Sequence, residues 1–165
     1  MEASPWGGCK TIERIFPVKA RERTDAVLVS AGGYPFDINF YQVMKSIMNT
    51  MNMVKDNGVI ALVASCIEGL GPEQFREWLN IESPVRLERE LRKSFTMIGK
   101  ITYDMKVGLK GKRVLIITDL SKEEVGLLGF QKIDSLEEAK NVLSWEEEPA
   151  LYVVPYGNIT LAKVD

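Results

Sequence analysis

Residues 25–64 establish the architecture, because they read DAVLVSAGG at one end and GVIALVA at the other. The continuous apolar runs at 26–29 and 59–64 are typical of strands that are buried on both faces of a parallel sheet. Between them, residues 39–56 place apolar side chains at helical spacing, namely Phe40, Val43, Met44, Ile47, Met48, Met51 and Val54. A strand, an amphipathic helix and a second strand in this order predict a right-handed parallel crossover.

Beyond residue 64, the alternation of helix and strand signals continues. The expected helices span residues 72–80 and 83–98, and two more begin with capping-box patterns at Ser121 and Ser135, the second ending near Trp145. The expected strands span residues 113–118, 150–154 and 159–164, and we expect the last to pair antiparallel with the one before it. The Asn57-Gly58 pair is a helix-end signal, so the first helix is expected to stop there.

The expected fold is therefore a three-layer, Rossmann-like α/β domain with a mostly parallel sheet and helices on both faces. We place this single domain at residues 25–165. Residues 1–24 contain several glycines and prolines and one short extended candidate at 13–18. They are expected to form an N-terminal arm or linker.

Composition and charge exclude several classes of protein. The 165 residues include 21 Lys and Arg and 23 Asp and Glu, and the resulting net charge of −2 argues against nucleic-acid binding. No apolar run is long enough for a transmembrane helix, and the first residues lack the pattern of a signal peptide. Two cysteines without histidine partners favour reduced thiols and a cytoplasmic location. The absence of histidine excludes Ser-His-Asp, Cys-His and histidine–metal chemistry within this chain, so no catalytic or metal-ligating residue is predicted in it.

The loop after the first strand is the first candidate site, because ligands of open α/β sheets bind beyond the carboxyl ends of the strands. We predict that it forms an anion- or cofactor-binding loop with Gly32, Gly33, Tyr34, Asp37 and Asn39. The two glycines permit a close backbone approach, and Asp37 is the expected N-cap of the following helix. The free N–H groups at the N-terminus of that helix are suited to an anion.

The polar face of the first helix is the second candidate site. Gln42 and Lys45 are three residues apart, and Tyr41 and Lys45 are four apart, so all three occupy neighbouring positions on one helix face. An amide, a phenol and an ammonium at these positions suit a carboxylate or a phosphate. The same spacing describes an ordinary solvent-exposed face, which is the commoner case, and both interpretations stay open at this point.

The loop after the second strand holds two more reactive or charged side chains. We expect Cys66 to be a buried filler rather than a reactive thiol. Glu68 is expected to face solvent, with the lining of a pocket by Glu68 and Gly69 as the alternative. The chain has no G-x-G-x-x-G pattern and no Walker lysine motif, so ordinary NAD or ATP binding has little support.

Residues 32–45 fit the pattern G-G-Y-P-x-D-x-N-x-Y-Q-x-x-K, and residues 68–71 read EGLG. Together with the two flanking strands, these residues resemble the C-terminal domain of the nickel-dependent lactate racemase family. The detailed resemblance covers residues 25–71. Beyond residues 95–99 it is mainly one of strand and helix order.

The resemblance implies an activity that this chain does not complete alone. The family interconverts stereoisomers of 2-hydroxy acids with a nickel-pincer nucleotide, by moving a hydride between substrate C2 and the cofactor. The resemblance places the nickel-ligating and proton-exchanging histidines in an N-terminal domain. It implies that Lys45 holds the substrate carboxylate, that Gln42 donates a hydrogen bond and that Tyr41 lines the pocket. A pocket tryptophan common in the family is missing, and Tyr103 is its expected substitute.

We therefore expect the substrate-side domain of a racemase-like enzyme, which is inert alone because it has no histidine. The expected partners are the histidine-bearing domain and a small 2-hydroxy acid, with no nucleic acid and no membrane. Association into a homo-oligomer is left open. The alternative is a stand-alone, non-catalytic α/β protein that binds an anion or another ligand without turnover.

Overall fold

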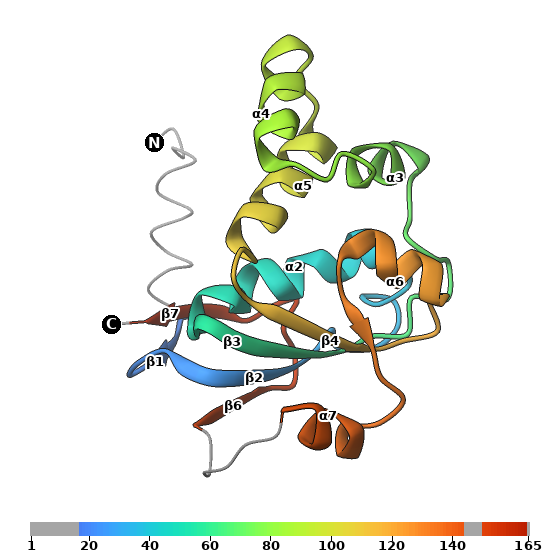
Figure 1. The fold of residues 1–165 in the computed structure, drawn as a ribbon. Coiled ribbons are helices and arrows are strands. Elements are labelled where there is room, and N and C mark those ends of the chain that lie inside the picture. Colours follow the sequence, from blue (N-terminus) through green and yellow to red (C-terminus); the bar gives the residue numbers. More distant parts are fainter. Residues whose placement is uncertain (1–16, 144–149, 165) are drawn as a thin grey trace, which may run out of the picture.

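A computed structural model describes residues 17–143 and 150–164 of the chain (Figure 1). The strands are β1 (Pro17–Ala20), β2 (Thr24–Ser30), β3 (Val54–Val63), β4 (Arg113–Ile117), β5 (Gln131–Lys132), β6 (Leu151–Val154) and β7 (Leu161–Val164). The helices are α2 (Phe40–Thr50), the 3-10 turn η1 (Met51–Met53), α3 (Glu73–Leu79), α4 (Pro84–Lys93), α5 (Met97–Gly108), α6 (Lys122–Leu128) and α7 (Leu136–Leu143). In this part of the chain, no helix has the length and apolar character needed to cross a membrane.

Five parallel strands form the central sheet in the order β5-β4-β3-β2-β6. From β2 to β5 each strand pairs with the one before it, and the connecting helices cover one face of the sheet (Figure 1). The last connection runs through α7 on the opposite face and places β6 beside β2. This arrangement confirms the predicted three-layer α/β fold with helices on both faces.

The two faces of the sheet are covered unequally. The larger core lies between the sheet and α2, where the predicted helical stripe buries Phe40 and Ile47. The Phe40 ring packs between Phe75 and Phe130, with ring centroids 6.3 and 5.7 Å away. The second cluster is small and includes Ala139 of α7 against the other face of the sheet. Apolar burial on the α2 face therefore provides most of the packing that holds the helices to the sheet.

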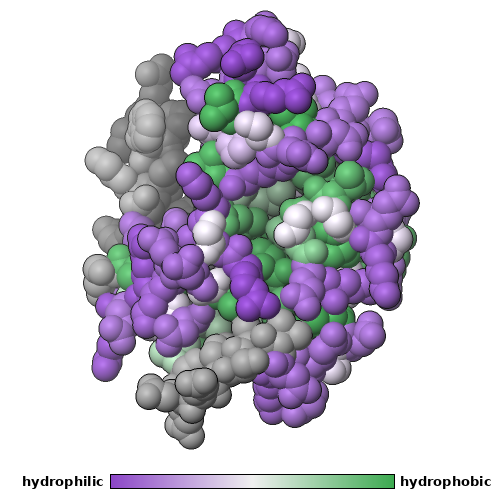
Figure 2. Space-filling view, viewed as in Figure 1, coloured by the Kyte–Doolittle hydropathy of each residue, from purple (hydrophilic) through white to green (hydrophobic). Residues whose placement is uncertain are grey.

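Apolar surface also remains in the middle of the face shown in Figure 2, between α5 and α6. A cleft of about 410 Å³ lies there, with Met105 and Phe130 among its walls. Lys106 borders this cleft, and its ammonium donates to the carbonyl oxygens of Leu79 and Ile81 at 2.8 Å. Burial lowers the pKa of Lys106. The Lys106 ammonium thus binds backbone oxygens at the end of α3 and stabilises the packing of α5 on α3.

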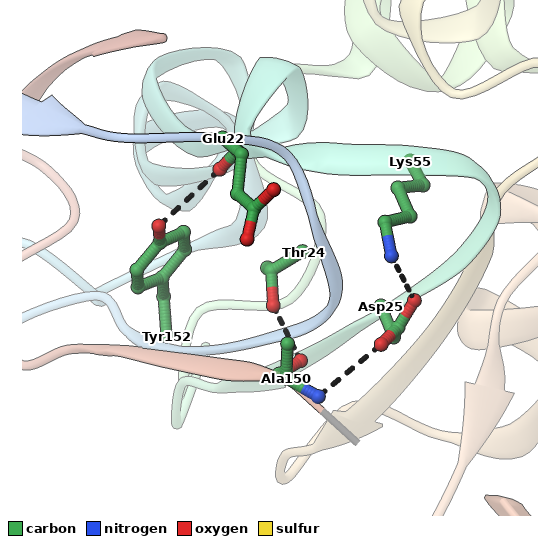
Figure 3. Close-up of polar contacts among 6 residues, drawn as sticks. All are labelled: Glu22, Thr24, Asp25, Lys55, Ala150 and Tyr152. Carbon is green, nitrogen blue, oxygen red and sulfur yellow. Dashed lines mark hydrogen bonds and ion pairs between the residues drawn. The ribbon is translucent and has the colours of Figure 1, made fainter.

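Side chains tie the amino ends of β2, β3 and β6 together (Figure 3). Asp25 accepts hydrogen bonds from Lys55 at 2.7 Å and from the backbone nitrogen of Ala150 at 3.2 Å. The Thr24 hydroxyl donates to the carbonyl oxygen of the same Ala150. The hydrogen bond from Lys55 lowers the pKa of Asp25. These contacts hold β6 in register on the edge of the sheet.

The first helix is shorter than the sequence predicts. It ends at Thr50, and β3 begins at Val54, so the predicted continuation of the helix is wrong. The Thr50 hydroxyl donates back to the carbonyl oxygen of Ser46 at 2.7 Å, a local bond that competes with helix continuation. The Asn57-Gly58 pair lies inside β3, where Asn57 has a φ of 64° and the pairing with β2 shifts register. Asn tolerates this left-handed conformation in a bulge as well as at a helix end, which explains the misassignment.

The helix predicted over residues 83–98 is two helices in the structure. The first ends at Lys93, and α5 begins at Met97 and continues to Gly108, beyond the predicted helix end. The break occurs because Thr96 caps α5 by accepting a hydrogen bond from the backbone nitrogen of Gly99 at 3.1 Å.

The two predicted capping patterns are present. Ser121 and Glu124 form a reciprocal capping box at α6, and the Ser135 hydroxyl accepts from the backbone nitrogen of Glu138 at 3.1 Å before α7. The predicted helix end near Trp145 lies outside the described residues. The sequence did not predict β5, because two residues are too few to show a strand periodicity.

The strand predicted over 159–164 is present as β7, but its predicted partner is wrong. It pairs parallel with β1 in a separate two-stranded sheet and does not pair with β6. The turn after β6 leaves the plane of the central sheet because the Gly157 nitrogen donates to the carbonyl oxygen of Ser30 at 2.9 Å. Residues 17–20, which were expected in the arm, are thus part of the folded unit, and residues 1–16 of the arm lie outside the described residues.

We expect Gly157→Ala to destabilise the fold by about 1–3 kcal/mol, because an added methyl group overpacks this site. A Cβ at Gly157 would lie 2.4 Å from Val29 Cγ2 and 2.8 Å from Ser46 Cβ. Gly126→Ala on α6 is the matched control, since a Cβ there meets nothing within 4 Å. Alanine favours the helix, so this control is expected to be neutral or stabilising. Urea unfolding measures both variants, and equal midpoints would contradict the close packing of the turn.

Candidate functional site

The loop between β2 and α2 is shaped by two glycines and by the side chains of Asp37 and Asn39. Gly32 and Gly33 have φ values of 98° and 75°, a left-handed conformation that favours glycine. The N-cap of α2 is Asn39, whose Oδ1 accepts from the Gln42 nitrogen at 3.1 Å, so the prediction of Asp37 as N-cap is wrong. Asp37 Oδ2 instead accepts from the backbone nitrogen of Ser65 at 3.1 Å. The Asp37 carboxylate thereby links the loops that follow β2 and β3.

The loop after β3 occupies the first turn of α2. The backbone nitrogens of Phe40 and Tyr41 donate to the carbonyl oxygens of Gly69 and Leu70 at 3.0 and 3.1 Å. With the Gln42 nitrogen bound to Asn39, the first three N–H groups of the helix already have partners. The expectation of free N–H groups for an anion is therefore wrong. These N–H groups of α2 are not available to an anion.

Gln42 and Lys45 lie together in a cleft of about 350 Å³, which we call the cationic cleft. Its walls are formed by Pro35, Phe36, Gln42, Lys45, Asn158 and Ile159. Lys45 Nζ donates to Gln42 Oε1 at 2.7 Å and has no carboxylate partner among the described residues. The bond to Gln42 Oε1 orients the amide and leaves its nitrogen as a donor beside the ammonium. The arrangement suits a carboxylate or phosphate, which accepts from both groups.

Tyr41 does not join these two side chains. Its ring packs edge-on against Phe75 of α3, with centroids 5.6 Å apart, and it is not among the residues that line the cationic cleft. Its Cβ also lies close to Gly71, where an added methyl carbon would come within 2.9 Å. Tyr41 and Lys45 lie in the same helix, four residues apart as expected, but the Tyr41 side chain turns toward Phe75 of α3.

A second cleft of about 490 Å³ lies on the other side of the same loop, at the carboxyl ends of β2, β3 and β4; we call it the acidic cleft. Its polar lining residues are Ser30, Asp37, Ser65, Thr118, Asp119 and Asp134, with the backbone of Gly33. Ser65 donates its hydroxyl hydrogen to Asp119. Three carboxylates and no basic side chain make this cleft unsuited to an anion. Among the described residues, no group of three His, Cys, Asp or Glu side chains is arranged to hold a metal ion.

The other predicted loop residues lie around this edge. Tyr34 is 75% exposed and follows the two glycines, and Glu68 is also exposed. Gly69 faces Glu124, which forms an ion pair with Arg76 at 3.3 Å. Neither Glu68 nor Gly69 lines either cleft.

The structure places Tyr103 away from both clefts. It lies on α5 (Met97–Gly108). It is not among the residues that line the acidic or the cationic cleft.

Sequence reasoning did not single out four of the six residues that line the cationic cleft. Pro35 and Phe36 belong to the predicted loop but were not named as site residues. Asn158 and Ile159 come from the turn after β6, more than a hundred positions beyond Lys45. The residues Pro-Tyr-Gly-Asn at 155–158 are typical of a turn, but turn chemistry carries no information about which residues lie opposite it. The pairing of β6 with β2 is what brings the turn beside α2.

Cys66 is buried, as predicted for a filler residue, and it is only 2% exposed. Burial raises the pKa of its thiol to about 11, and the negative charges of Asp37 and Asp119 act in the same direction. We expect an alkylating reagent at mildly alkaline pH to modify Cys66 about 100-fold more slowly in the folded chain than in denaturant, because the thiolate is the reactive form. Peptide mapping by mass spectrometry measures both rates. Equal rates would contradict the burial of this thiol.

Comparisons with known proteins bear on the family and the fold of the chain. A family model described as the lactate racemase C-terminal domain matches residues 19–159. The lactate racemases of Thermoanaerobacterium thermosaccharolyticum and Lactiplantibacillus plantarum are 41% identical over 71 residues and 35% identical over 75 residues. The structure of the lactate racemase apoprotein from T. thermosaccharolyticum is similar with a TM-score of 0.80 at 27% identity. A protein from Thermotoga maritima shares the fold, with a TM-score of 0.62 at 12% identity.

The chain spans only part of these proteins. The sequence matches cover 43% and 46% of this chain but 16% and 18% of the two curated racemases. The structural match covers 98% of this chain and 40% of the T. thermosaccharolyticum apoprotein, and the T. maritima match covers 95% and 41%. More than half of each structural relative therefore has no counterpart here.

Proposed function

Because this chain belongs to the lactate racemase C-terminal domain family, we propose that it is the substrate-side domain of an enzyme that interconverts stereoisomers of a 2-hydroxy acid. The observation that carries this proposal is the pairing of Lys45 and Gln42 in the cationic cleft. The ammonium lacks a carboxylate partner among the described residues, and the substrate's own carboxylate would supply one.

In this proposal the chain binds and orients the substrate. Lys45 holds the carboxylate by charge and hydrogen bonding, and the Gln42 amide nitrogen donates a second hydrogen bond. A carboxylate fixed at two points restricts rotation of the adjacent C2 carbon, which lowers the entropic barrier to reaction at that carbon. Phe36 and Pro35 supply apolar surface on the wall of the cleft.

Tyr41 has a different role in this proposal from the one that the family resemblance implies. Its ring contacts Phe75 and is absent from the lining of the cleft. We therefore propose that Tyr41 holds α2 against α3 and so positions Lys45 one turn further along the helix.

The donor set of this chain does not fit a nickel site. The sequence contains no histidine, and the described residues offer no cluster of three metal-ligating side chains. A nickel-pincer nucleotide would then be held by a histidine-bearing domain, and the chain alone would be inert.

We propose that the histidine-bearing domain contacts the protein surface around the two clefts. Tyr34, Phe36, Ile67 and Ile159 are large apolar residues between 48% and 75% exposed, and all lie in loops at the carboxyl edge of the sheet. Exposed apolar side chains grouped around a binding site are typical of a surface that another domain covers. A second copy of the chain is the alternative occupant.

The proposal predicts that Lys45→Gln lowers racemisation about 10²- to 10³-fold, because the variant removes the charge that fixes the carboxylate. The measurement is D-lactate formation from L-lactate by the full-length protein or complex in which this chain occurs. Lys122→Gln, at the exposed start of α6, is the matched control and should retain activity. Near-normal turnover of Lys45→Gln with an intact circular dichroism spectrum would contradict the proposed role.

An immunoblot of source cells separates this proposal from a stand-alone binding protein. A band much larger than 18.6 kDa is expected if a histidine-bearing domain belongs to the same chain. A band at that size, with lactate binding but no partner and no turnover, would favour the non-catalytic alternative.

A further inference from the structure

The turn between β6 and β7 is fixed against α2 and forms the far wall of the cationic cleft. Asn49 Nδ2 donates to the carbonyl oxygen of Gly157 at 2.9 Å and to that of Asn158 at 3.4 Å. The Gly157 nitrogen donates to the Ser30 carbonyl oxygen at 2.9 Å. The backbone of the turn is thus tied to both α2 and β2, so its side chains keep a defined place in the cleft.

The Asn158 amide is incompletely satisfied at this position. Its Oδ1 atom is buried without a hydrogen-bond partner among the described residues, and a Cβ added to Gly32 would lie 3.0 Å from it. Oδ1 and Nδ2 diverge from the same carbon, so with Oδ1 beside Gly32 the Nδ2 group points away from Gly32. Within the described residues no hydrogen bond from Nδ2 is found, although Asn158 lines the cleft with Gln42 and Lys45. The side chain therefore offers a free donor to a bound molecule.

Ile159 follows directly in the chain and contributes an apolar wall. It is 68% exposed, and it lines the cleft together with Phe36, which is 48% exposed. Such exposed apolar surface beside three polar donors matches a ligand that has a carboxylate at one end and a hydrocarbon chain at the other.

We propose that this turn completes the substrate site: Asn158 donates a third hydrogen bond to the carboxylate, and Ile159 contacts the carbon chain beyond C2. The inference rests on the proposed function, since the ligand is the same 2-hydroxy acid. A carboxylate is not a stereocentre, so a third donor to it holds both stereoisomers equally, as a racemase requires.

The test is an NMR titration of the ¹⁵N-labelled chain with acetate, lactate and 2-hydroxyhexanoate. Asn158→Asp replaces the donor by a negative charge, and we expect it to weaken the binding of all three acids at least about tenfold. Asn158→Ala is expected to weaken them about threefold. Ile159→Ala should leave acetate binding unchanged and reduce the preference for 2-hydroxyhexanoate about fourfold or more, because the longer chain loses apolar contact.

Matched controls separate this inference from the proposed function. Tyr156→Ala alters an exposed side chain of the same turn outside the cleft and should bind all three acids as the wild type does. Lys45→Gln should abolish binding if the proposed site is correct. One outcome would overturn the role of the turn and leave the proposed function standing. In that outcome Lys45→Gln loses binding, while both Asn158 variants and Ile159→Ala keep the wild-type affinities. No binding by the wild type would overturn both. Unchanged amide shifts in the central sheet verify the fold of each variant.

Discussion

The hydrogen bonds from the first turn of α2 to the loop after β3 determine the arrangement of the whole carboxyl edge. The carbonyl oxygens of Gly69 and Leu70 accept from the first two N–H groups of the helix, and Asp37 holds the start of the same loop. Without these hydrogen bonds, the loops that follow the parallel strands β2 and β3 would not be joined to each other. Because the helix is fixed at its first turn, Gln42 in that turn and Lys45 in the next turn have defined positions. These two residues determine where the cationic cleft lies.

The same hydrogen bonds also determine which groups of the protein are available to an anion. A helix N-terminus with free N–H groups would attract negative charge by itself. Here those groups are used internally, so the positive charge in the cleft comes from Lys45 alone among its lining residues. The carboxylates of Asp37, Asp119 and Asp134 lie in the acidic cleft on the other side of the loop. A negatively charged ligand is therefore attracted to one cleft and repelled by the other.

Much of the fold was accessible from the sequence because its signals are local. Apolar runs predicted β2, β3 and β4, and the helical stripe that begins at Phe40 predicted the buried face of α2. Spacing also predicted that Gln42 and Lys45 are neighbours. The sequence could not reveal that Tyr41 turns toward Phe75, because helix spacing gives a position and not a rotamer. Nor could it reveal Asn158, whose place depends on a strand pairing between distant segments.

The late position of β6 in the chain has a consequence for folding. Thr24 and Ala150 are joined by a hydrogen bond although they are 126 residues apart. The second edge of β2 therefore stays unpaired until β6, near the end of the chain, has been synthesised. During synthesis on the ribosome, β2, α2 and β3 can associate early because their contacts are local. Until β6 arrives, the nascent domain exposes an unpaired apolar strand edge, which is a site for misassociation with other chains. The cationic cleft lacks one wall for the same period, so the ligand recognition proposed for it requires the turn after β6 to have docked.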